Sequence, residues 1–211
     1  AKTDFLSRMS HDIRTPMNAI IGMTALARDE TNNPKVLEYL SKISTSSDFL
    51  LALINDVLDM EKISSGKLIL KPERYRFEEF TAAINTLFIP LSKKKNINFI
   101  FEKGKTKKDV LVDKVRFNQI FFNIISNAIK FTPPRGTVTF SIDKSLIKGD
   151  ILECDFSITD TGCGMSENFM AHMYEAFEQE NQNHISSSEG SGLGLAIVKQ
   201  LVTLMNGTIS C

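Results

Sequence analysis

The sequence has few cysteines, no long apolar run and no excess of either charge. Its three cysteines form no Cys-x-x-Cys pair and have no paired histidine, which argues against a disulfide framework or a zinc site. No apolar run approaches the roughly 18–20 residues that cross a bilayer, and no signal peptide opens the chain. Lys+Arg and Asp+Glu both number 25, so a clustered basic footprint for nucleic acid is not expected.

The N-terminal part predicts a helical hairpin. Apolar residues recur there at alternating steps of three and four, which indicates helices over 3–28 and 35–63 with a loop at 29–34. Pro16 is expected to kink the first helix. Because two helices cannot bury their whole apolar face, we expect two chains to form a four-helix bundle. The seam residues of the first helix are Leu6, Met9, Ile13, Pro16, Ile20, Met23 and Ala27.

A histidine lies on the first helix outside this seam. His11 falls between Met9 and Ile13 and is therefore expected to point away from the partner helices. Asp12 is its neighbour, and Thr15 shares its face one turn later. Taken alone, this pattern fits a solvated surface histidine as well as a reactive imidazole.

The composition changes after Ser64-Ser65-Gly66, where a second, α/β domain is predicted to begin. The long polar stretch 166–189 is typical of a lid or a disordered segment. The predicted strands are 67–70, 98–102, 109–112, 136–144 and 151–160, with another starting at 207, and the predicted helices are 77–94, 113–131, a piece around 169–177, and 195–205.

The helix over 113–131 carries a polar stripe formed by Arg116, Asn123, Asn127 and Lys130. Such a stripe can be simply solvated. However, asparagine is a poor helix former, an amide oxygen can bind a hard cation, and a lysine one turn later can meet a phosphate.

Two glycine-rich segments follow. Asp160 ends a strand, and Gly162 and Gly164 after it permit a sharp turn that a flat ligand can approach closely. An ordinary Asp-x-Gly turn would look the same. The second segment, 190–194, leads into the last helix and can offer backbone amides to phosphates, although flexible loops share this pattern.

In this order, the motifs resemble the catalytic core of sensor histidine kinases of two-component signalling, and the hybrid type most closely. The motifs are His-Asp-x-x-Thr-Pro on a hairpin, the asparagine helix, Asp-x-Gly-x-Gly, a lid containing phenylalanine, and Gly-x-Gly-x-Gly. The resemblance implies an α+β fold, with a dimerisation and phosphotransfer hairpin at 1–65 and a catalytic ATP-binding α/β sandwich of the gyrase and heat-shock chaperone type at 66–211.

The resemblance also implies a role for each motif residue. His11 would accept the phosphoryl group, and Asp12 would accept or orient the proton of the His11 imidazole. Thr15 would assist a reverse phosphatase step. Asn127 would hold Mg²⁺. The residues implied to bind ATP are Asn123, Asn127, Lys130, Asp160, Gly162, Gly164, Phe177 as the lid anchor, Gly190, Gly192, Leu193 and Gly194.

Three departures from the family pattern accompany these expectations. Further strands usually follow the position of Gly207, the lid segment 185–189 lacks the arginine that some members carry, and no sensor or receiver segment is present. We also expect the two domains to swing about Ile63–Lys67. The opening residues read as a continuation of something longer.

The expected partners are a second copy of the chain and a receiver domain with a phosphorylatable aspartate, with no nucleic acid and no membrane segment in this chain. The parent protein is expected to be membrane-anchored, with this portion in the cytoplasm. Two alternatives remain: an ATPase of the same nucleotide-binding superfamily, and a dimeric nucleotide-binding scaffold without histidine phosphorylation.

Overall fold

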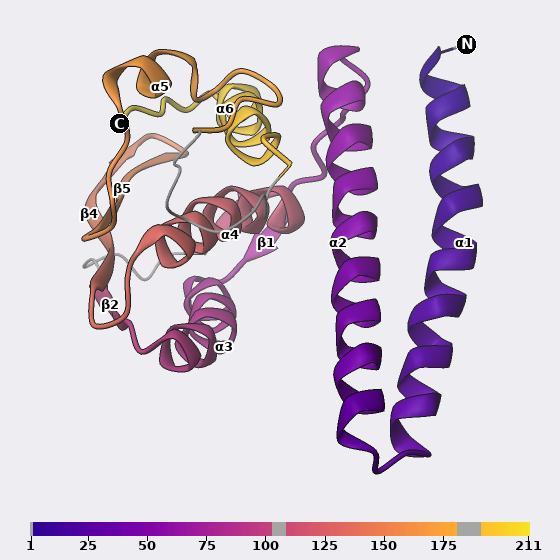
Figure 1. Cartoon of the computed structure of the whole chain (residues 1–211). Coiled ribbons are helices and arrows are strands. Elements are labelled where there is room, and N and C mark those ends of the chain that lie inside the picture. Colours follow the sequence, from indigo (N-terminus) through magenta and orange to yellow (C-terminus); the bar gives the residue numbers. More distant parts are fainter. Residues whose placement is uncertain (1, 103–108, 181–190) are drawn as a thin grey trace. The chain divides into compact units, whose positions relative to one another are not determined.

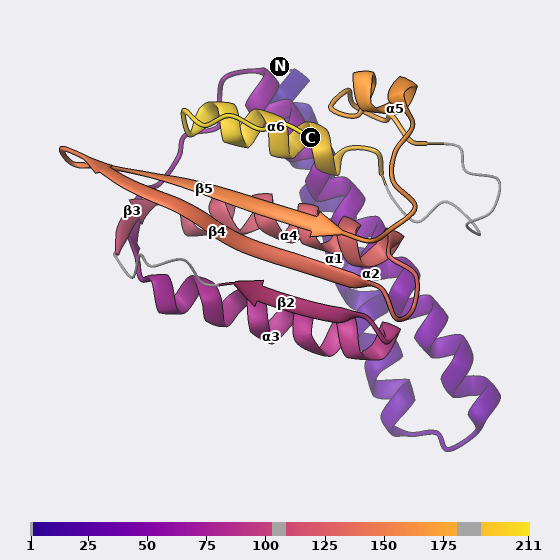
Figure 2. The same ribbon diagram turned by 90° about the vertical axis from the view of Figure 1, so that its left-hand side faces the viewer.

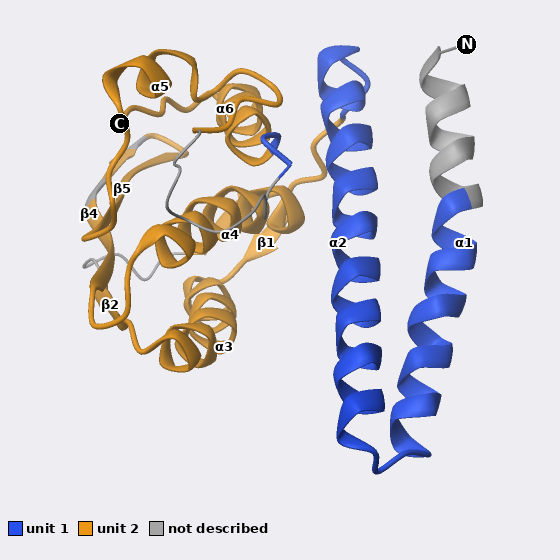
Figure 3. Cartoon of the chain, viewed as in Figure 1, with its two compact units in different colours: residues 1–68, 189–193 blue, residues 69–188, 194–211 orange. Residues whose placement is uncertain are grey.

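The computed structural model describes residues 2–102, 109–180 and 191–211, without the side chains of 2–12, 144, 145 and 148. It divides into two compact units, which Figure 3 colours separately. The first comprises residues 1–68 with 189–193, and the second comprises 69–188 with 194–211.

The first unit is the predicted hairpin. Helix α1 spans Lys2–Asp29 and helix α2 spans Pro34–Ser64, and they run side by side along their length (Figure 1). Asn33 caps α2 by accepting a hydrogen bond from the Lys35 amide at 3.0 Å, and Pro34 occupies the first turn, where no amide donor is needed. Helix α1 continues through Pro16 without a break.

The contact between the two helices is narrow. Met17 and Thr24 of α1 and Ser47 of α2 are buried, whereas Ile20 and Met23 of the predicted seam are 42% and 68% exposed. The predicted seam is therefore displaced from the buried stripe within one hairpin. Two of its residues, Ile20 and Met23, line an apolar groove together with Ala19, Thr24, Leu40 and Ile43.

The strand predicted at Lys67–Leu70 is wrong. The amides of Lys67 and Leu68 both donate to the carbonyl of Lys62, at 2.9 and 3.0 Å, and Gly66 takes a positive φ of 66°. These groups close the C-terminus of α2 and are not available to a β-ladder. The first strand instead lies at Glu73–Tyr75 (β1), paired antiparallel with β3 at Val110–Val112.

The second unit is a two-layer α/β sandwich. The strands β2 (Asn98–Glu102), β4 (Thr137–Lys148) and β5 (Ile151–Asp160) form a sheet in the order β2-β4-β5. The β2–β4 pair is parallel and the β4–β5 pair is antiparallel. Helices α3 (Phe77–Lys95), α4 (Lys114–Phe131) and α6 (Gly194–Leu204) cover one face of this sheet (Figures 1 and 2).

Phenylalanine rings fill the space between the helices and the sheet. Phe80 of α3 lies 5.1 Å from Phe121 of α4, and Phe121 lies 4.8 Å from Phe156 of β5, between ring centroids. Phe140 and Val138 of β4 are completely buried. The alternation of β5, with Glu153 and Asp155 exposed and Cys154 and Phe156 partly covered, leaves the opposite sheet face polar.

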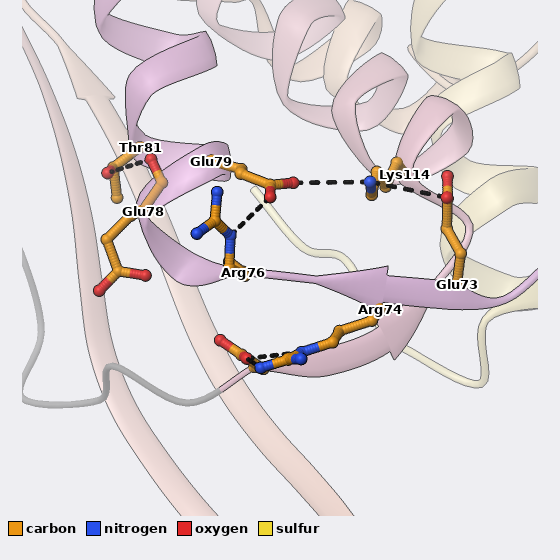
Figure 4. Close-up of polar contacts among 8 residues, drawn as sticks. Glu73, Arg74, Arg76, Glu78, Glu79, Thr81 and Lys114 are labelled. Carbon is orange, nitrogen blue, oxygen red and sulfur yellow. Dashed lines mark hydrogen bonds and ion pairs between the residues drawn. The ribbon is translucent and has the colours of Figure 1, made fainter.

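A charged cluster joins the N-terminal ends of α3 and α4 to β1 (Figure 4). Lys114 Nζ lies 3.6 Å from Glu73 Oε2 and 3.5 Å from Glu79 Oε2. Arg76 Nε donates to Glu79 Oε1 at 2.6 Å, and this hydrogen bond lowers the pKa of Glu79. Because these ion pairs are partly solvated, they add little to the free energy of folding. We assign them the role of orienting the ends of α3 and α4 relative to β1.

Two C-terminal expectations also differ from the structure. The helix predicted around 169–177 is shorter and earlier, at Glu167–His172 (α5), because Ser166 caps it and Phe177 adopts a positive φ of 70°. Residues 207–211 form no strand. The Gly207 amide donates instead to the Val202 carbonyl at 2.8 Å, which closes α6.

Candidate functional site

Helix α4 presents the predicted polar stripe beside a buried apolar face. Asp113 caps its N-terminus by accepting from the Arg116 amide at 3.1 Å, and Ile125 on the opposite side is completely buried. Asn123, Asn127 and Lys130 are partly buried. Burial of the apolar side of α4 therefore turns the polar stripe away from the core, as the sequence predicted.

The Asp160 turn packs directly against the end of α4. Asp160 Oδ1 accepts from the Gly162 amide at 2.8 Å, and the Thr161 hydroxyl oxygen accepts from the Thr137 amide at 2.9 Å. A Cβ on Gly162 would lie 2.9 Å from the carbonyl oxygen of Phe131 and 2.5 Å from Asp160 Oδ1. Only glycine allows the turn to approach α4 this closely.

Gly164 has a different reason to be glycine. Its φ is +72°, and a Cβ there would meet nothing within 4 Å. Glycine is therefore required at this position by the left-handed backbone and not by a close neighbour. The sequence predicted a sharp turn, and Gly164 makes it with its positive φ. The close approach at Gly162 is to α4, and the approach of a flat ligand stays a prediction.

Helix α6 begins beside the asparagine stripe. Asn123 Nδ2 donates to the carbonyl of Gly194 at 3.4 Å, and a Cβ on Gly194 would be 3.7 Å from Asn123 Cγ. The start of α6 and the Asp160 turn thus both lie against α4, the first at Asn123 and the second at Phe131. Gly190 lies outside the described residues.

The short glycine-rich segment before α6 groups with the hairpin. Gly192 has a φ of +68°, and Leu193 is buried, with its amide donating to the Ser191 hydroxyl at 3.1 Å. Ser191 Oγ in turn donates to Asp56 Oδ2 on α2 at 3.1 Å. Burial raises the pKa of Asp56, the Ser191 hydrogen bond opposes this rise, and Asp59 adds to it.

Phe177 is 68% exposed and holds a left-handed backbone. A non-glycine residue in this conformation is strained. Near it, a hollow of 480 Å³ is lined by Ser166, Asn168, Phe169, His172, Glu178, Gln179 and Glu180. None of these is a predicted site residue.

On the hairpin, Thr15 is exposed, as predicted. His11 and Asp12 lie in the helical backbone of α1, and their side chains are outside the described residues. Arg14 Nη2 donates to Asn55 Oδ1 of α2 at 2.9 Å, which ties the motif segment to the second helix. The sequence pattern did not predict Asn55 as a partner, because contacts between helices leave no periodic signal.

Comparison with known proteins matches both halves of the chain. Residues 1–66 match the family model "His Kinase A (phospho-acceptor) domain". Residues 112–211 match "Histidine kinase-, DNA gyrase B-, and HSP90-like ATPase". The chain belongs to the sensor histidine kinases.

Individual relatives agree with this family. The histidine kinase chain is 36% identical over 211 residues to the autoinducer 2 sensor kinase/phosphatase LuxQ of Vibrio vulnificus, covering 99% of this chain and 24% of that protein. It is 35% identical over 210 residues to the signal transduction histidine-protein kinase BarA of Escherichia coli, covering 99% and 23%. The chain therefore spans about a quarter of the length of these relatives.

Solved structures agree on the fold. The crystal structure of full-length ShkA in complex with AMPPNP matches with a TM-score of 0.74 at 30% identity, covering 96% of this chain and 41% of that one. Histidine kinase AdeS of Acinetobacter baumannii matches with a TM-score of 0.58 at 19% identity, covering 92% and 86%, which supports the fold alone.

These matches confirm the predicted family and the predicted architecture of a helical hairpin followed by an ATP-binding α/β sandwich. They do not favour the alternatives without histidine phosphorylation, because the phospho-acceptor family covers the hairpin itself. No helix among the described residues combines the length and the apolar character that crossing a membrane requires.

Proposed function

We propose that this chain phosphorylates itself on His11 at the expense of ATP and passes the phosphoryl group to a receiver-domain aspartate. The observation that carries the proposal is that the start of α6 and the Asp160 turn both pack against α4, in a chain that also matches a phospho-acceptor hairpin.

The residues of these elements fit an adenine nucleotide. Asp160 is exposed and uses Oδ1 for the Gly162 amide, and its carboxylate can also accept a hydrogen bond from the adenine amine. Gly162 leaves room that a Cβ would fill. Lys130 and the glycines of the 190–194 segment would bind the phosphates, and Phe177 would anchor the lid.

Asn127 fits the role of a magnesium ligand. Its amide oxygen is a hard donor of the kind Mg²⁺ accepts, and the ion usually takes few protein ligands beside substrate phosphates and water. The described residues contain no cluster of three His, Cys, Asp or Glu side chains suited to a metal. Bound Mg²⁺ would offset triphosphate charge.

The hairpin residues would supply the nucleophile. A neutral His11 uses the lone pair of one ring nitrogen to form the nitrogen–phosphorus bond as the bond from the γ-phosphorus to the bridging oxygen breaks, and ADP leaves. Asp12 holds the proton of the other ring nitrogen, which keeps the attacking nitrogen free and stabilises the positive charge that develops. Exposed Thr15 would orient water in a phosphatase step toward the receiver.

A second copy of the chain is the proposed hairpin partner. The groove lined by Ile20, Met23, Leu40 and Ile43 is apolar and open in one protomer. Covering it with the same surface of another hairpin would complete a four-helix bundle. The receiver partner is proposed from the hybrid-kinase relatives, and the parent protein is proposed to be membrane-anchored with this portion in the cytoplasm.

Labelling with γ-³²P-ATP and Mg²⁺ tests the proposal. The chain should acquire an acid-labile, alkali-stable label that is lost in His11→Gln and retained in His172→Gln, an exposed histidine on α5. A label that persists in His11→Gln would contradict the proposed site. ATP binding without any label would instead favour the scaffold alternative.

A further inference from the structure

Lys95 is the last residue of α3, and its ammonium group contacts the end of α4. Lys95 Nζ donates to the carbonyl oxygen of Ile129 at 2.8 Å and also to that of Lys130. Carbonyls in the last turn of a helix have no partner within the helix. Lys95 is partly buried. Lys93 and Lys94 are exposed.

The last turn of α4 is held from both sides. The carbonyl of Ala128 accepts from the Thr132 amide at 3.1 Å and from the Thr132 hydroxyl at 2.6 Å. The carbonyl of Phe131 lies against Gly162 of the Asp160 turn. Lys130 therefore sits between a turn fixed by Lys95 and the turn proposed to bind adenine.

The loops that follow α3 and α4 are tied together as well. The Arg135 amide donates to the Asn96 carbonyl at 2.7 Å, and the Asn98 amide donates to the Gly136 carbonyl at 2.9 Å. Two helix C-termini consequently end at the same place. Each carries a partial negative charge of about half an elementary charge, and the Lys95 ammonium lies where it offsets that charge. Burial lowers the pKa of Lys95.

We propose that Lys95 is a positioning residue for the nucleotide phosphates, acting through the last turn of α4 and Lys130. This inference rests on the proposed function of Asn127 and Lys130. Without the Lys95 charge, a triphosphate would face the uncompensated negative charge at the C-terminus of α4. The carbonyl of Lys130 would also lose its hydrogen bond to Lys95. The loss of affinity should therefore grow with the number of phosphates on the ligand.

Binding of AMPPNP, ADP and adenosine to the whole chain, with Mg²⁺, tests this. In Lys95→Met we expect AMPPNP to bind about tenfold more weakly, since a charge-assisted hydrogen bond is lost. ADP should weaken less, and adenosine affinity should stay within about twofold. Lys94→Met, in the same helical turn, is the matched control and should bind all three ligands normally. Lys95→Arg should restore most AMPPNP affinity, because it keeps the charge and the donors.

A purely structural role predicts a different pattern. If folded Lys95→Met loses affinity for all three ligands equally, or for none, the proposal is overturned. Should Lys95→Met not fold, Lys95→Gln keeps a donor without the charge, and normal AMPPNP affinity in that variant overturns the electrostatic role. If the unaltered chain binds no AMPPNP, the proposed function itself fails, which is a separate result.

Discussion

The two units of this chain differ in how far each buries its own apolar surface. The ATP-binding unit buries Ile125, Val138 and Phe140 completely between its helices and its sheet. The hairpin leaves Met23 68% and Leu26 60% exposed. In a sandwich, two layers cover each other's apolar faces, whereas two paired helices bury only the narrow surface along which they touch. The comparison supports the proposal that the first unit binds a second copy of the chain and that the second unit binds a nucleotide.

The largest expected effect is on the core of the ATP-binding unit. Phe140→Ala removes a completely buried ring and should lower the free energy of unfolding by about 3–5 kcal/mol. The exposed Leu146→Ala, on the same strand β4, should change it by less than about 0.5 kcal/mol. Urea unfolding followed by circular dichroism measures both. Similar losses in the two variants would remove the contrast between core and surface.

The next effect concerns the close approach at Gly162. Gly162→Ala places a Cβ 2.9 Å from the Phe131 carbonyl oxygen and 2.5 Å from Asp160 Oδ1, so the turn must shift. Because Asp160 is proposed to bind adenine, ADP should bind about tenfold more weakly. Gly149→Ala, in the β4–β5 turn, has a positive φ and open space, so it should reduce stability without changing ADP affinity. Calorimetric titration distinguishes them, and unchanged affinity in Gly162→Ala would refute the packing argument.

A smaller effect distinguishes two glycines of the hairpin. Gly66 has a φ of +66°, and alanine there should cost about 1–2 kcal/mol. Gly22 lies within α1 with nothing within 4 Å of an added Cβ, so Gly22→Ala should stabilise the hairpin by about 0.5–1 kcal/mol. Thermal unfolding should shift in opposite directions. Shifts of the same sign would mean that Gly66 does not close α2 as described.

The smallest effect is pH-dependent and involves Asp56. Because burial raises its pKa above the ordinary 3.8, the folded protein holds this proton more tightly than the unfolded chain does. The Asp56 contribution is therefore fully present below pH 3.8 and is lost as the pH rises through the raised pKa. Asp56→Asn should raise the melting temperature relative to the unaltered chain above this window, and not below it.

Melting curves at several pH values measure this difference. Asp48→Asn, at an exposed position of α2, is the matched control. A gain for Asp56→Asn that is the same at every pH would mean that ionisation of Asp56 is not its source.

The sequence predicted most of the fold because periodicity reports burial. Helices α1 to α4 and strands β2 and β5 lie within one or two residues of their predicted bounds. The errors fall where backbone amides donate hydrogen bonds to the last carbonyls of a helix, as the amides of Lys67 and Leu68 do after α2. Such hydrogen bonds leave the apolar pattern of the segment unchanged, so the pattern alone suggested a strand.

The candidate site was predictable only in part. Asn123 stood out because asparagine is a poor helix former, and Asp160 because it ends a strand and is followed by two closely spaced glycines. Lys95 and Asn55 did not, since their partners, the Ile129 and Lys130 carbonyls and Arg14, come together only in the folded chain. The predicted roles of His11, Asp12 and Phe177 remain proposals.

The measurement that tests the central comparison most directly is the oligomeric state by sedimentation. If the hairpin groove is built for a second copy, the unaltered chain should sediment as a dimer and Met23→Asp as a monomer. Leu111→Asp, at a 78% exposed position of the ATP-binding unit, should remain a dimer. A monomeric unaltered chain, or a Met23→Asp variant that dimerises normally, would contradict the account.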